Sequence, residues 1–263
     1  MKRIILFIII TLSFLSGSFA QIPVCVRCWS SGTAFTLPKN RIEMDLFRLS
    51  SIGLTDKLEL SAHPLMMFLL PQIELKAGWG KFAGATVATE HELTYPTFFL
   101  GTVSMKGTGG LISPEYHYPQ MIAIYNGFLA TWGLFKNADI TGKAGVAFSV
   151  RSGSLNPYST IDLPVIYPRL KVFYHNQETD LAFGFRWRFL SLFGWQFSGE
   201  SFIFPGASNN FFFENRSALD YYSKKQILRI QLGYKLCYGL YPPGPQWHFL
   251  PVIDLALGFP TVK

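Results

Sequence analysis

Two cysteines near the start of the chain, Cys25 and Cys28, have a spacing that occurs in redox motifs and in halves of zinc sites. A redox role requires a thioredoxin-like strand–helix–strand setting, and a structural zinc site requires a second pair of ligands. The surrounding sequence offers neither of these. We therefore expect Cys25 and Cys28 to form a local disulfide or to remain two free thiols, with no metal and no cofactor bound.

The triplet Glu90-His91-Glu92 is the other concentrated set of candidate ligands. In a β-strand, successive side chains point to opposite faces, so the two carboxylates share one face and the imidazole lies on the other. Ligands of one metal ion must converge on it, which makes the triplet a poor metal site. The remaining histidines are scattered: His63, His117, His175 and His248. The chain also lacks the Gly-x-Ser-x-Gly elbow of many hydrolases, and no catalytic residue is predicted.

The segments that would position any site alternate with a period of two. Between Lys225 and Tyr238, apolar residues occupy positions 228, 230, 232, 234, 236 and 238. The positions between them hold Arg229, Gln231, Gly233, Lys235 and Cys237. A helix would place residues 228 and 232 together but would turn residue 230 to the opposite side. The pattern predicts a strand with one apolar and one polar face, on which Cys237 is a small filler.

Shorter alternating runs recur along the rest of the chain. They lie at residues 42–46, 58–61, 73–76, 143–151, 169–172, 179–189 and 253–259. Turn-forming residues separate these runs, and we find no convincing amphipathic helix. The glycine- and proline-rich stretch 106–120 shows no alternation and is expected to form one long loop.

The first twenty residues carry the three parts of a secretory signal. Lys2 and Arg3 provide the positive charge, an apolar run extends from Ile4 to Leu15, and small residues precede a cleavage position before Gln21. This run is shorter than the about 20 residues that a membrane-spanning helix needs, and no later run reaches that length. The chain is nevertheless 49% hydrophobic and only 15% charged. For an exported chain without a spanning helix, the remaining solution in a membrane is a closed β-barrel.

We therefore predict a signal peptide at residues 1–20 and one domain over residues 21–263. The domain is expected to be an all-β, transmembrane, antiparallel up-and-down barrel in the outer membrane. Removing the signal leaves 263 − 20 = 243 residues. A membrane strand of about 9–11 residues with a connection of similar size takes roughly 20 residues. The mature chain then provides about 12 strands, within a range of roughly 10–14.

Alternation alone does not say which face is outside, because a soluble exported β protein also alternates, with its apolar face inward. The number of runs and the aromatic residues near strand ends favour lipid on the apolar face. The aromatic residues expected at the membrane interface are Trp79, Trp132, Trp187, Trp195, Tyr234, Tyr238, Tyr241 and Trp247.

Two segments resemble those of known outer-membrane proteins. Residues 51–60, Ser-Ile-Gly-Leu-Thr-Asp-Lys-Leu-Glu-Leu, are similar to the strand–turn–strand phrase common in Gram-negative outer-membrane β-barrels. Residues 107–112 together with 119–122 resemble a group of uncharacterised porin-like or transporter-like outer-membrane proteins. The resemblance implies the fold and the location. It brings no assigned activity, so no functional residue is carried over.

A function would lie on the inward faces. On the early strands these faces are mostly acidic, with Glu43, Asp45, Glu59 and Glu74 beside Arg41. On the later strands they are expected to be basic, with Arg169, Lys171, Arg186, Arg188, Arg229 and Lys235. Strands far apart in sequence face each other across a barrel. An acidic wall would then face a basic wall, and such walls select ions and orient dipolar solutes.

The sequence accordingly predicts a narrow, non-enzymatic channel or transporter for small polar or charged solutes. One alternative is a non-conducting barrel braced by inward ion pairs. A less favoured alternative is a lipid hydrolase with Ser, His and an acid on neighbouring strands. The formal charge is +7, or +7 − 2 = +5 without the signal, yet no basic run points to nucleic acid. Outer-membrane lipids and acidic lipopolysaccharide are the expected partners.

Overall fold

The computed structural model describes residues 28–68, 70–107, 112–135, 137–206, 211–242 and 244–259. The predicted signal peptide and Cys25 lie outside these residues. Residues 108–111 of the predicted long loop lie outside them as well.

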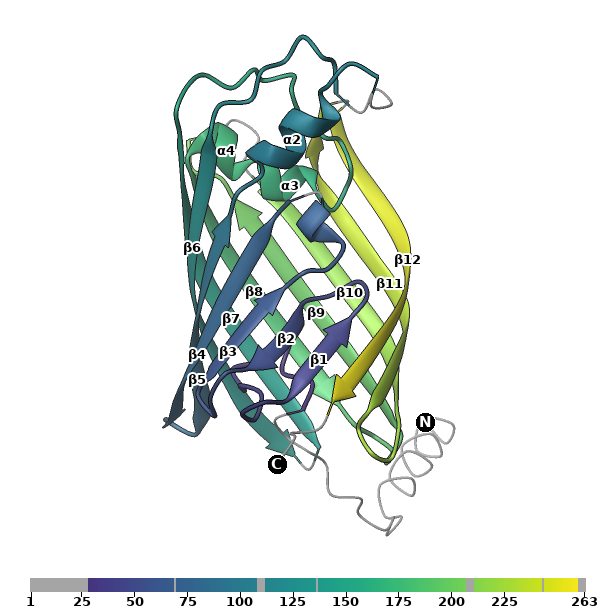
Figure 1. Ribbon diagram of the computed structural model, residues 1–263. Coiled ribbons are helices and arrows are strands. Elements are labelled where there is room, and N and C mark those ends of the chain that lie inside the picture. Colours follow the sequence, from purple (N-terminus) through teal and green to yellow (C-terminus); the bar gives the residue numbers. More distant parts are fainter. Residues whose placement is uncertain are drawn as a thin grey trace, which may run out of the picture.

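Twelve antiparallel strands close into one barrel, in which every strand pairs with its sequence neighbours and β1 pairs with β12 (Figure 1). The strands are β1 (Ile42–Asp45), β2 (Ser50–Gly53), β3 (Leu58–Ala62), β4 (Gln72–Phe82), β5 (Ala85–Thr94), β6 (Met121–Phe135), β7 (Ala138–Arg151), β8 (Gln177–Trp187), β9 (Phe193–Ile203), β10 (Phe211–Tyr222), β11 (Leu228–Tyr241) and β12 (Gly244–Phe259). This arrangement confirms the predicted all-β barrel and the expected number of strands.

The period of two in the sequence becomes the two faces of the wall. On β11, Leu232 is exposed on the outside, whereas Arg229 and Gln231 are buried. The same division holds around the barrel, whose outer face carries exposed apolar side chains on strand after strand. They include Ile73, Leu93, Ile124, Phe128, Phe148, Leu181, Phe183, Leu219, Phe249, Ile253 and Leu255. The exterior is therefore apolar in the way that a lipid-facing surface requires.

The wall is uneven on one side. Strands β1, β2 and β3 have four or five residues each, whereas β12 has 16. β1 pairs with β12 only at residues 256–259. Beyond β1 the chain continues beside β12 irregularly, through the amide of Leu46 to the carbonyl of Leu255 (3.1 Å) and the amide of Phe47 to Asp254 Oδ1 (3.0 Å).

The two ends of the barrel differ in their connections. At one end, called the turn end below, hairpins such as 54–57, 83–84 and 188–192 are short. At the other, called the loop end, the β5–β6 and β7–β8 connections span residues 95–120 and 152–176. In bacterial membrane barrels the long loops are extracellular and the short turns periplasmic.

Short helices, which the sequence did not predict, occupy the loop end. They are η1 (Met66–Phe68), α2 (Thr97–Val103), α3 (Tyr167–Leu170) and α4 (Val172–His175). The strand predicted from the alternation at 169–172 is wrong, because these residues belong to α3 and α4. Four residues are too few to separate the two periods, and Pro168 suits the first turn of a helix. Asn176, in the left-handed conformation at φ 66°, ends α4.

No helix among the described residues is long and apolar enough to cross a membrane.

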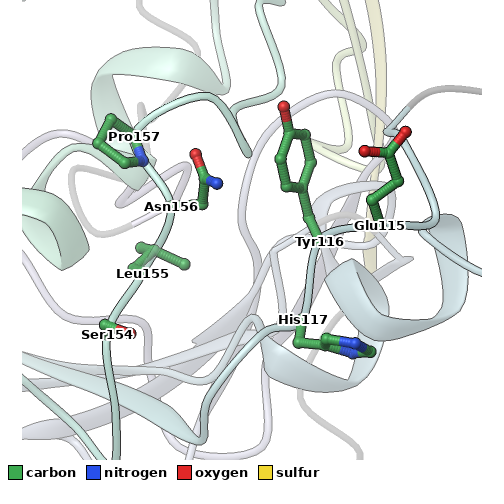
Figure 2. A pocket seen from close by; sticks show the side chains of 7 residues that line it. All are labelled: Glu115, Tyr116, His117, Ser154, Leu155, Asn156 and Pro157. Atoms are coloured by element: carbon green, nitrogen blue, oxygen red, sulfur yellow. The ribbon is translucent and has the colours of Figure 1, made fainter.

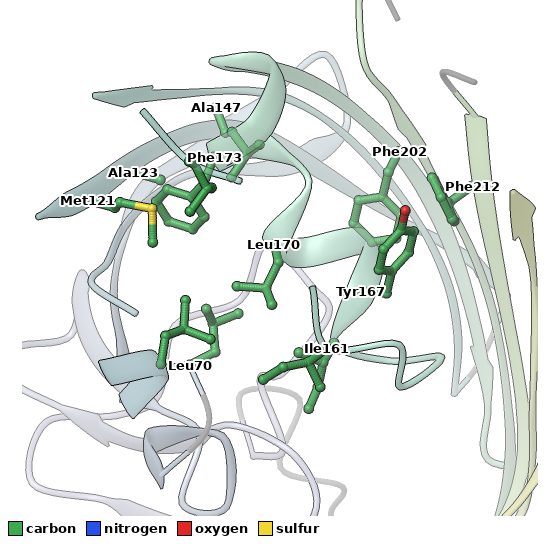
Figure 3. Packing of buried hydrophobic residues seen from close by; sticks show 14 of the residues in the cluster. Leu70, Met121, Ala123, Ala147, Ile161, Tyr167, Leu170, Phe173, Phe202 and Phe212 are labelled. Atoms are coloured by element: carbon green, nitrogen blue, oxygen red, sulfur yellow. The ribbon is translucent and has the colours of Figure 1, made fainter. Parts of the chain in front are cut away.

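An apolar cluster fills the barrel at the loop end (Figure 3). Leu170 and Phe173 of the α3–α4 segment are almost completely buried there, against inward-facing side chains such as Phe202 and Phe212 of the wall. Tyr241, expected at the membrane interface, belongs to this cluster instead: its side chain faces inward, and its hydroxyl donates to the carbonyl of Pro164 (3.1 Å). Tyr241 is an odd-numbered residue of β11 and therefore shares the inward face with Arg229 and Gln231, which places it away from the membrane interface.

Candidate functional site: the barrel interior

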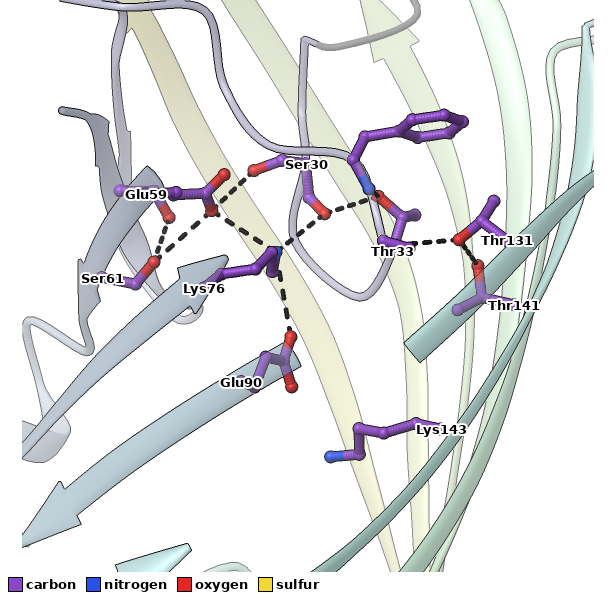
Figure 4. Close-up of polar contacts among 12 residues, drawn as sticks. Ser30, Thr33, Glu59, Ser61, Lys76, Glu90, Thr131, Thr141 and Lys143 are labelled. Carbon is purple, nitrogen blue, oxygen red and sulfur yellow. Dashed lines mark hydrogen bonds and ion pairs between the residues drawn. The ribbon is translucent and has the colours of Figure 1, made fainter. Parts of the chain in front are cut away.

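Residues 28–38, called the inner segment below, run inside the barrel at its turn end. Ser30 Oγ donates to Glu59 of β3 (2.8 Å), and the amide of Ala34 donates to Thr131 of β6 (2.8 Å) (Figure 4). Arg186 of β8 donates to the carbonyl of Trp29 (2.8 Å). Because β3, β6 and β8 stand on different sides of the barrel, the segment crosses the interior rather than lining one wall. No expectation from the sequence included this feature.

Trp29 anchors the inner segment. Its side chain is buried, and its amide donates to Glu43 Oε1 (2.7 Å). Its indole N–H donates to Gln226 Oε1 (3.3 Å). The guanidinium groups of Arg41 and Arg229 lie 5.6 and 4.7 Å from the ring centre. Desolvated contacts of this kind contribute up to about 2 kcal/mol each.

A buried ion-pair cluster lies beneath the inner segment. The side chain of Lys76 is 1% exposed, and its Nζ lies 3.4 Å from Glu59 Oε1 and 3.8 Å from Glu90 Oε1. The carbonyl of Ser30 accepts a further bond from Lys76 Nζ (3.4 Å). Figure 4 shows this lysine reaching from the wall to both carboxylates and to the inner segment. The turn end of the interior is therefore tightly closed by polar contacts.

The middle of the interior holds a second network that is partly open to solvent. Lys143 Nζ lies 2.7 Å from Asp180 Oδ2 and 2.8 Å from Glu200 Oε1. Arg169 forms a two-point contact with Glu214 (2.8 and 2.9 Å), which Lys235 approaches at 2.6 Å. The side chains of Lys143, Arg169 and Lys235 are 20, 25 and 19% exposed. Water-sized space thus exists between the inner segment and the loop-end cluster.

The acidic residues expected on the early strands lie inside the barrel. Glu43, Asp45, Glu59 and Glu74 are all buried. Each of the first three has a cationic neighbour: Arg41 bonds Glu43 (2.8 Å), Arg229 bonds Asp45, and Lys76 approaches Glu59.

The expected basic wall is wrong. The later strands carry inward acidic residues as well: Asp180, Glu200, Glu214, Asp220 and Asp254. Cations on these strands pair with nearby carboxylates, as Lys235 does with Glu214 and Arg186 with Asp139 (2.9 Å). The alternation did contain part of this signal, because Asp180 and Asp254 fall on the polar faces of recognised runs. Strand β10, which supplies Glu214 and Asp220, was not recognised in the sequence.

Three of the predicted basic residues are not on strands. Arg169 lies on α3, Lys171 joins α3 to α4, and Arg188 follows β8. The guanidinium of Arg188 sits 4.1 Å from the ring centre of Tyr222. Lys171 is buried, with its Nζ 4.9 Å from the ring centre of Phe212, and this burial lowers the pKa of its ammonium group.

The α3–α4 segment is held inside the mouth by polar bonds as well as apolar packing. Ser149 Oγ donates to the carbonyl of Val172, and Arg151 donates to the carbonyl of Phe173 (both 2.8 Å). His175, at the end of α4, has its ring 5.8 Å from that of Phe204. Burial lowers the pKa of His175, and the positive charges of Lys171 and Arg151 lower it further.

The predicted interface aromatics lie on the outer face, apart from Tyr241. Trp79, Trp132 and Trp247 are exposed, and Trp187, Trp195, Tyr234 and Tyr238 are half-buried against neighbouring outer side chains. Tyr238 and Trp247, on adjacent strands, have ring centres 4.5 Å apart.

The Glu90-His91-Glu92 triplet is divided between the two faces of β5. Glu90 points inward to Lys76, whereas His91 lies outside and bonds Asn126 Oδ1 (2.8 Å). Among the described residues, no group of three or more His, Cys, Asp and Glu side chains is placed to hold a metal ion.

Of the two cysteines predicted to form a local disulfide, the structure describes only Cys28. Cys28 is buried at the start of the inner segment and is disulfide-bonded, but Cys25 lies outside the described residues, so the pairing of these two cysteines stays a prediction. Cys237 is a free, buried thiol on the inward face of β11.

A surface pocket of about 400 Å³ lies between the two long connections at the loop end (Figure 2). Residues 115–117 line one side and residues 154–157 the other. Its lining includes a carboxylate, Glu115, an imidazole, His117, and a hydroxyl, Ser154. Within the described chain no hydrogen bond joins these three side chains, whereas a nucleophile and its base must lie within hydrogen-bond reach of each other.

A closed antiparallel barrel with an apolar exterior and a charged interior defines the chain as a β-barrel of the outer-membrane type. No protein-family model matches its sequence, and no curated protein is significantly similar to it.

Several solved structures are similar to this chain, each with a TM-score below 0.5. The KdgM porin, solved in complex with disordered oligogalacturonate, aligns with a TM-score of 0.43 at 7% identity, over 83% of this chain and 94% of KdgM. OccK11 (OpdR) of Pseudomonas aeruginosa aligns at 0.39 and 12% identity, over 85% of this chain and 64% of its own. DcaP of Acinetobacter baumannii aligns at 0.36 and 9% identity, over 93 and 69%. The similarity concerns the barrel alone and says nothing about a solute.

Proposed function

We propose that the protein is a non-enzymatic outer-membrane channel for small polar or charged solutes, closed in the present conformation at both ends. The observation that carries this proposal is the partly exposed charged network in the middle of the interior, around Lys143, Arg169 and Lys235. A barrel that served only as a scaffold would be more stable if packed apolar side chains filled this space in place of the charged ones. Charged, wet interiors are what small hydrophilic solutes need.

Two barriers would have to move for conduction. The inner segment closes the turn end through Trp29 and Ser30, and the α3–α4 segment closes the loop end through apolar packing and the Arg169–Glu214 contact. The inner segment precedes β1 and the α3–α4 segment connects β7 to β8, so neither is a wall strand and either can move without opening the barrel.

Conductance of the purified protein in planar bilayers tests the proposal. We expect rare openings for the native protein and at least several-fold more frequent or larger openings for Trp29→Ala, which removes the anchor of the inner segment. Trp79→Ala, on the outer face, is the matched control and should behave like the native protein. If none of the three proteins shows conductance with any of the salts and small solutes tested, the channel proposal is wrong.

One observation favours a second candidate, a non-conducting barrel braced by inward ion pairs. Both Lys76 with Glu59 and Arg229 with Asp45 have side chains no more than 3% exposed. Such pairs hold the turn end in one arrangement. Silence of the Trp29→Ala variant would favour this candidate.

We also propose that the apolar outer face binds outer-membrane lipids and that the positively charged chain favours acidic lipopolysaccharide near its loop end. Co-purification of lipopolysaccharide with protein from outer membranes, lost at high salt, would support the second part.

A further inference from the structure

A single row of inward side chains crosses five neighbouring strands between the inner segment and the loop-end cluster. Glu74 on β4 pairs in register with Glu92 on β5, and Glu92 pairs with Tyr125 on β6. Tyr125 pairs with Ala147 on β7, and Ala147 pairs with Glu178 on β8. Strands lie about 4.8 Å apart, so Glu92 and Glu178 are separated by roughly 14 Å along the curved wall. The row thus places carboxylates at both ends and apolar groups in the middle.

The carboxylates of this row have no ion-pair partner among the described residues. Glu74 and Glu178 are 7 and 8% exposed, and within the described ranges neither has an ion-pair or hydrogen-bond partner. Glu92 accepts a bond from Thr94 Oγ1 (2.7 Å) but likewise has no cation within 4.0 Å there. A carboxylate in a confined space needs a counter-charge or a proton.

The nearest lysines already serve other carboxylates. Lys76 lies between Glu59 and Glu90, and Lys143 bonds Asp180 and Glu200. The row therefore has three acidic side chains in excess, beside the partly exposed space around Lys143. A positively charged occupant would complete it.

The middle of the row suits the alkyl part of such an occupant. The ring of Tyr125 lies flat along the wall over Gly127 and Gly145, where an added Cβ would come within 2.6 and 2.2 Å of the tyrosine oxygen. The ammonium of Lys143 sits 5.3 Å from the centre of this ring. The hydroxyl of Tyr125 donates to Asp180 Oδ2 (2.9 Å), so the polar end of this side chain is satisfied and the rest of its ring is an apolar surface. Ala147 adds a small apolar surface beside it.

We infer that this row binds an extended organic cation, with ammonium groups at Glu74 and Glu92 and at Glu178, and with its alkyl chain over Tyr125 and Ala147. The inference deepens the proposed function, on which it rests, by naming the solute class. A single metal ion fits less well, because the carboxylates are spread along the wall and no group of them in the described chain converges on a point.

Binding to the purified, folded protein in detergent tests this without requiring conduction. The readout is the temperature at which the folded, fast-migrating gel band converts to the unfolded band, because a ligand that binds the folded state raises it. Spermidine is the probe, compared with NaCl of equal ionic strength and with MgCl₂. We expect spermidine to raise the native transition by several degrees in a saturable manner. The triple variant Glu74→Gln, Glu92→Gln, Glu178→Gln should lose this rise, and Glu115→Gln, on an exposed loop, should keep it.

Four results decide the matter. No saturable rise for the native protein, or an equal rise for the triple variant, overturns the inference. An equal rise with MgCl₂ overturns the extended-cation class, since a point charge would suffice. If the triple variant does not fold, the single variant Glu178→Gln is tested instead. The inference then stands only if this variant raises the half-saturating spermidine concentration by about tenfold. Spermidine stabilisation in a protein that never conducts would contradict the channel proposal and leave this inference intact.

Discussion

Lys76 links two carboxylates of the wall at the turn end. Its ammonium lies between Glu59 and Glu90, and its side chain is almost completely buried. We expect Lys76→Met to lower the free energy of unfolding by about 3–5 kcal/mol, because both carboxylates would be left buried without their cation. Urea titration of the folded protein in detergent measures this change. Adding Glu59→Gln to Lys76→Met should recover part of the loss. A single variant within 1 kcal/mol of the native protein would show that the pair is not buried as described.

Arg169 holds the α3–α4 segment to the wall through its two bonds to Glu214. Burial would lower the pKa of Arg169, but the carboxylate of Glu214 outweighs it and raises the pKa. We expect Arg169→Ala to loosen residues 152–176, with protease cleavage there faster by roughly tenfold. This corresponds to about 1.4 kcal/mol, less than a fully buried pair because a quarter of the side chain is exposed.

The matched control for that variant is Arg186→Ala. Arg186 also makes a two-point ion pair, with Asp139, but it lies among the contacts of the inner segment at the other end. Cleavage within 152–176 should stay at the native rate in this control. Equal acceleration in both variants would mean that general instability, rather than the Arg169 contact, is being measured.

For single residues, the sequence predicts which face of a strand a side chain occupies. It says little about which side chain will be its ion-pair or hydrogen-bond partner. Gln231 and Cys237 are inward because their neighbours on β11 are apolar, which is local information. The position of Arg169 could not be predicted in this way, because an alternation over only four residues is also compatible with a helix. That Glu214 meets both Arg169 and Lys235 depends on how a long loop folds back into the barrel. No spacing along the chain records this contact.

The α4 helix gives the loop end a dependence on acidity. His175 has a pKa below its ordinary value of 6.5, so it binds a proton more readily when the α3–α4 segment has left the mouth. The neutral form therefore favours closure above about pH 6.5, and this contribution is lost as the pH falls below that value. Lys171 and Arg151 supply the positive charges that add to the effect of burial on His175. We expect channel opening to become more frequent between pH 7.5 and 5.5.

Single-channel recordings at pH 7.5, 6.5 and 5.5 check this expectation. His175→Gln, which keeps a polar side chain of similar size but cannot titrate, should open with one frequency across the series. An unchanged pH response in that variant would assign the effect to another group.

The wall strands and the chain inside them differ in how far the sequence predicts them. A strand such as β11 carries its own evidence, because each outward residue is apolar over more than ten positions. The inner segment has no such period, since it meets several strands, β1, β3, β4, β6 and β8, through scattered hydrogen bonds rather than through a ladder. Its sequence is therefore indistinguishable from that of an ordinary loop. Its location inside the barrel follows only from the three-dimensional structure.

For the whole molecule, the composition and the period of two were sufficient to predict the closed barrel and its number of strands. They were not sufficient to predict that the interior is interrupted at both ends. The expected field between an acidic and a basic wall failed because acidic residues on β8 to β10 and β12 interleave with the bases. Local pairing of opposite charges removes the cost of burying each one, which separated walls would not do.

The central claim is that the apolar face of every strand contacts lipid while the polar face encloses the interior. Nitroxide labels placed one at a time at residues 229–235 of β11, in protein reconstituted into bilayers and with the native cysteines replaced, test it most directly. Collision with oxygen, which concentrates in hydrocarbon, should peak at residues 230, 232 and 234 and fall at 229, 231, 233 and 235. The opposite alternation, with oxygen collisions highest at 229, 231 and 235, would contradict the account.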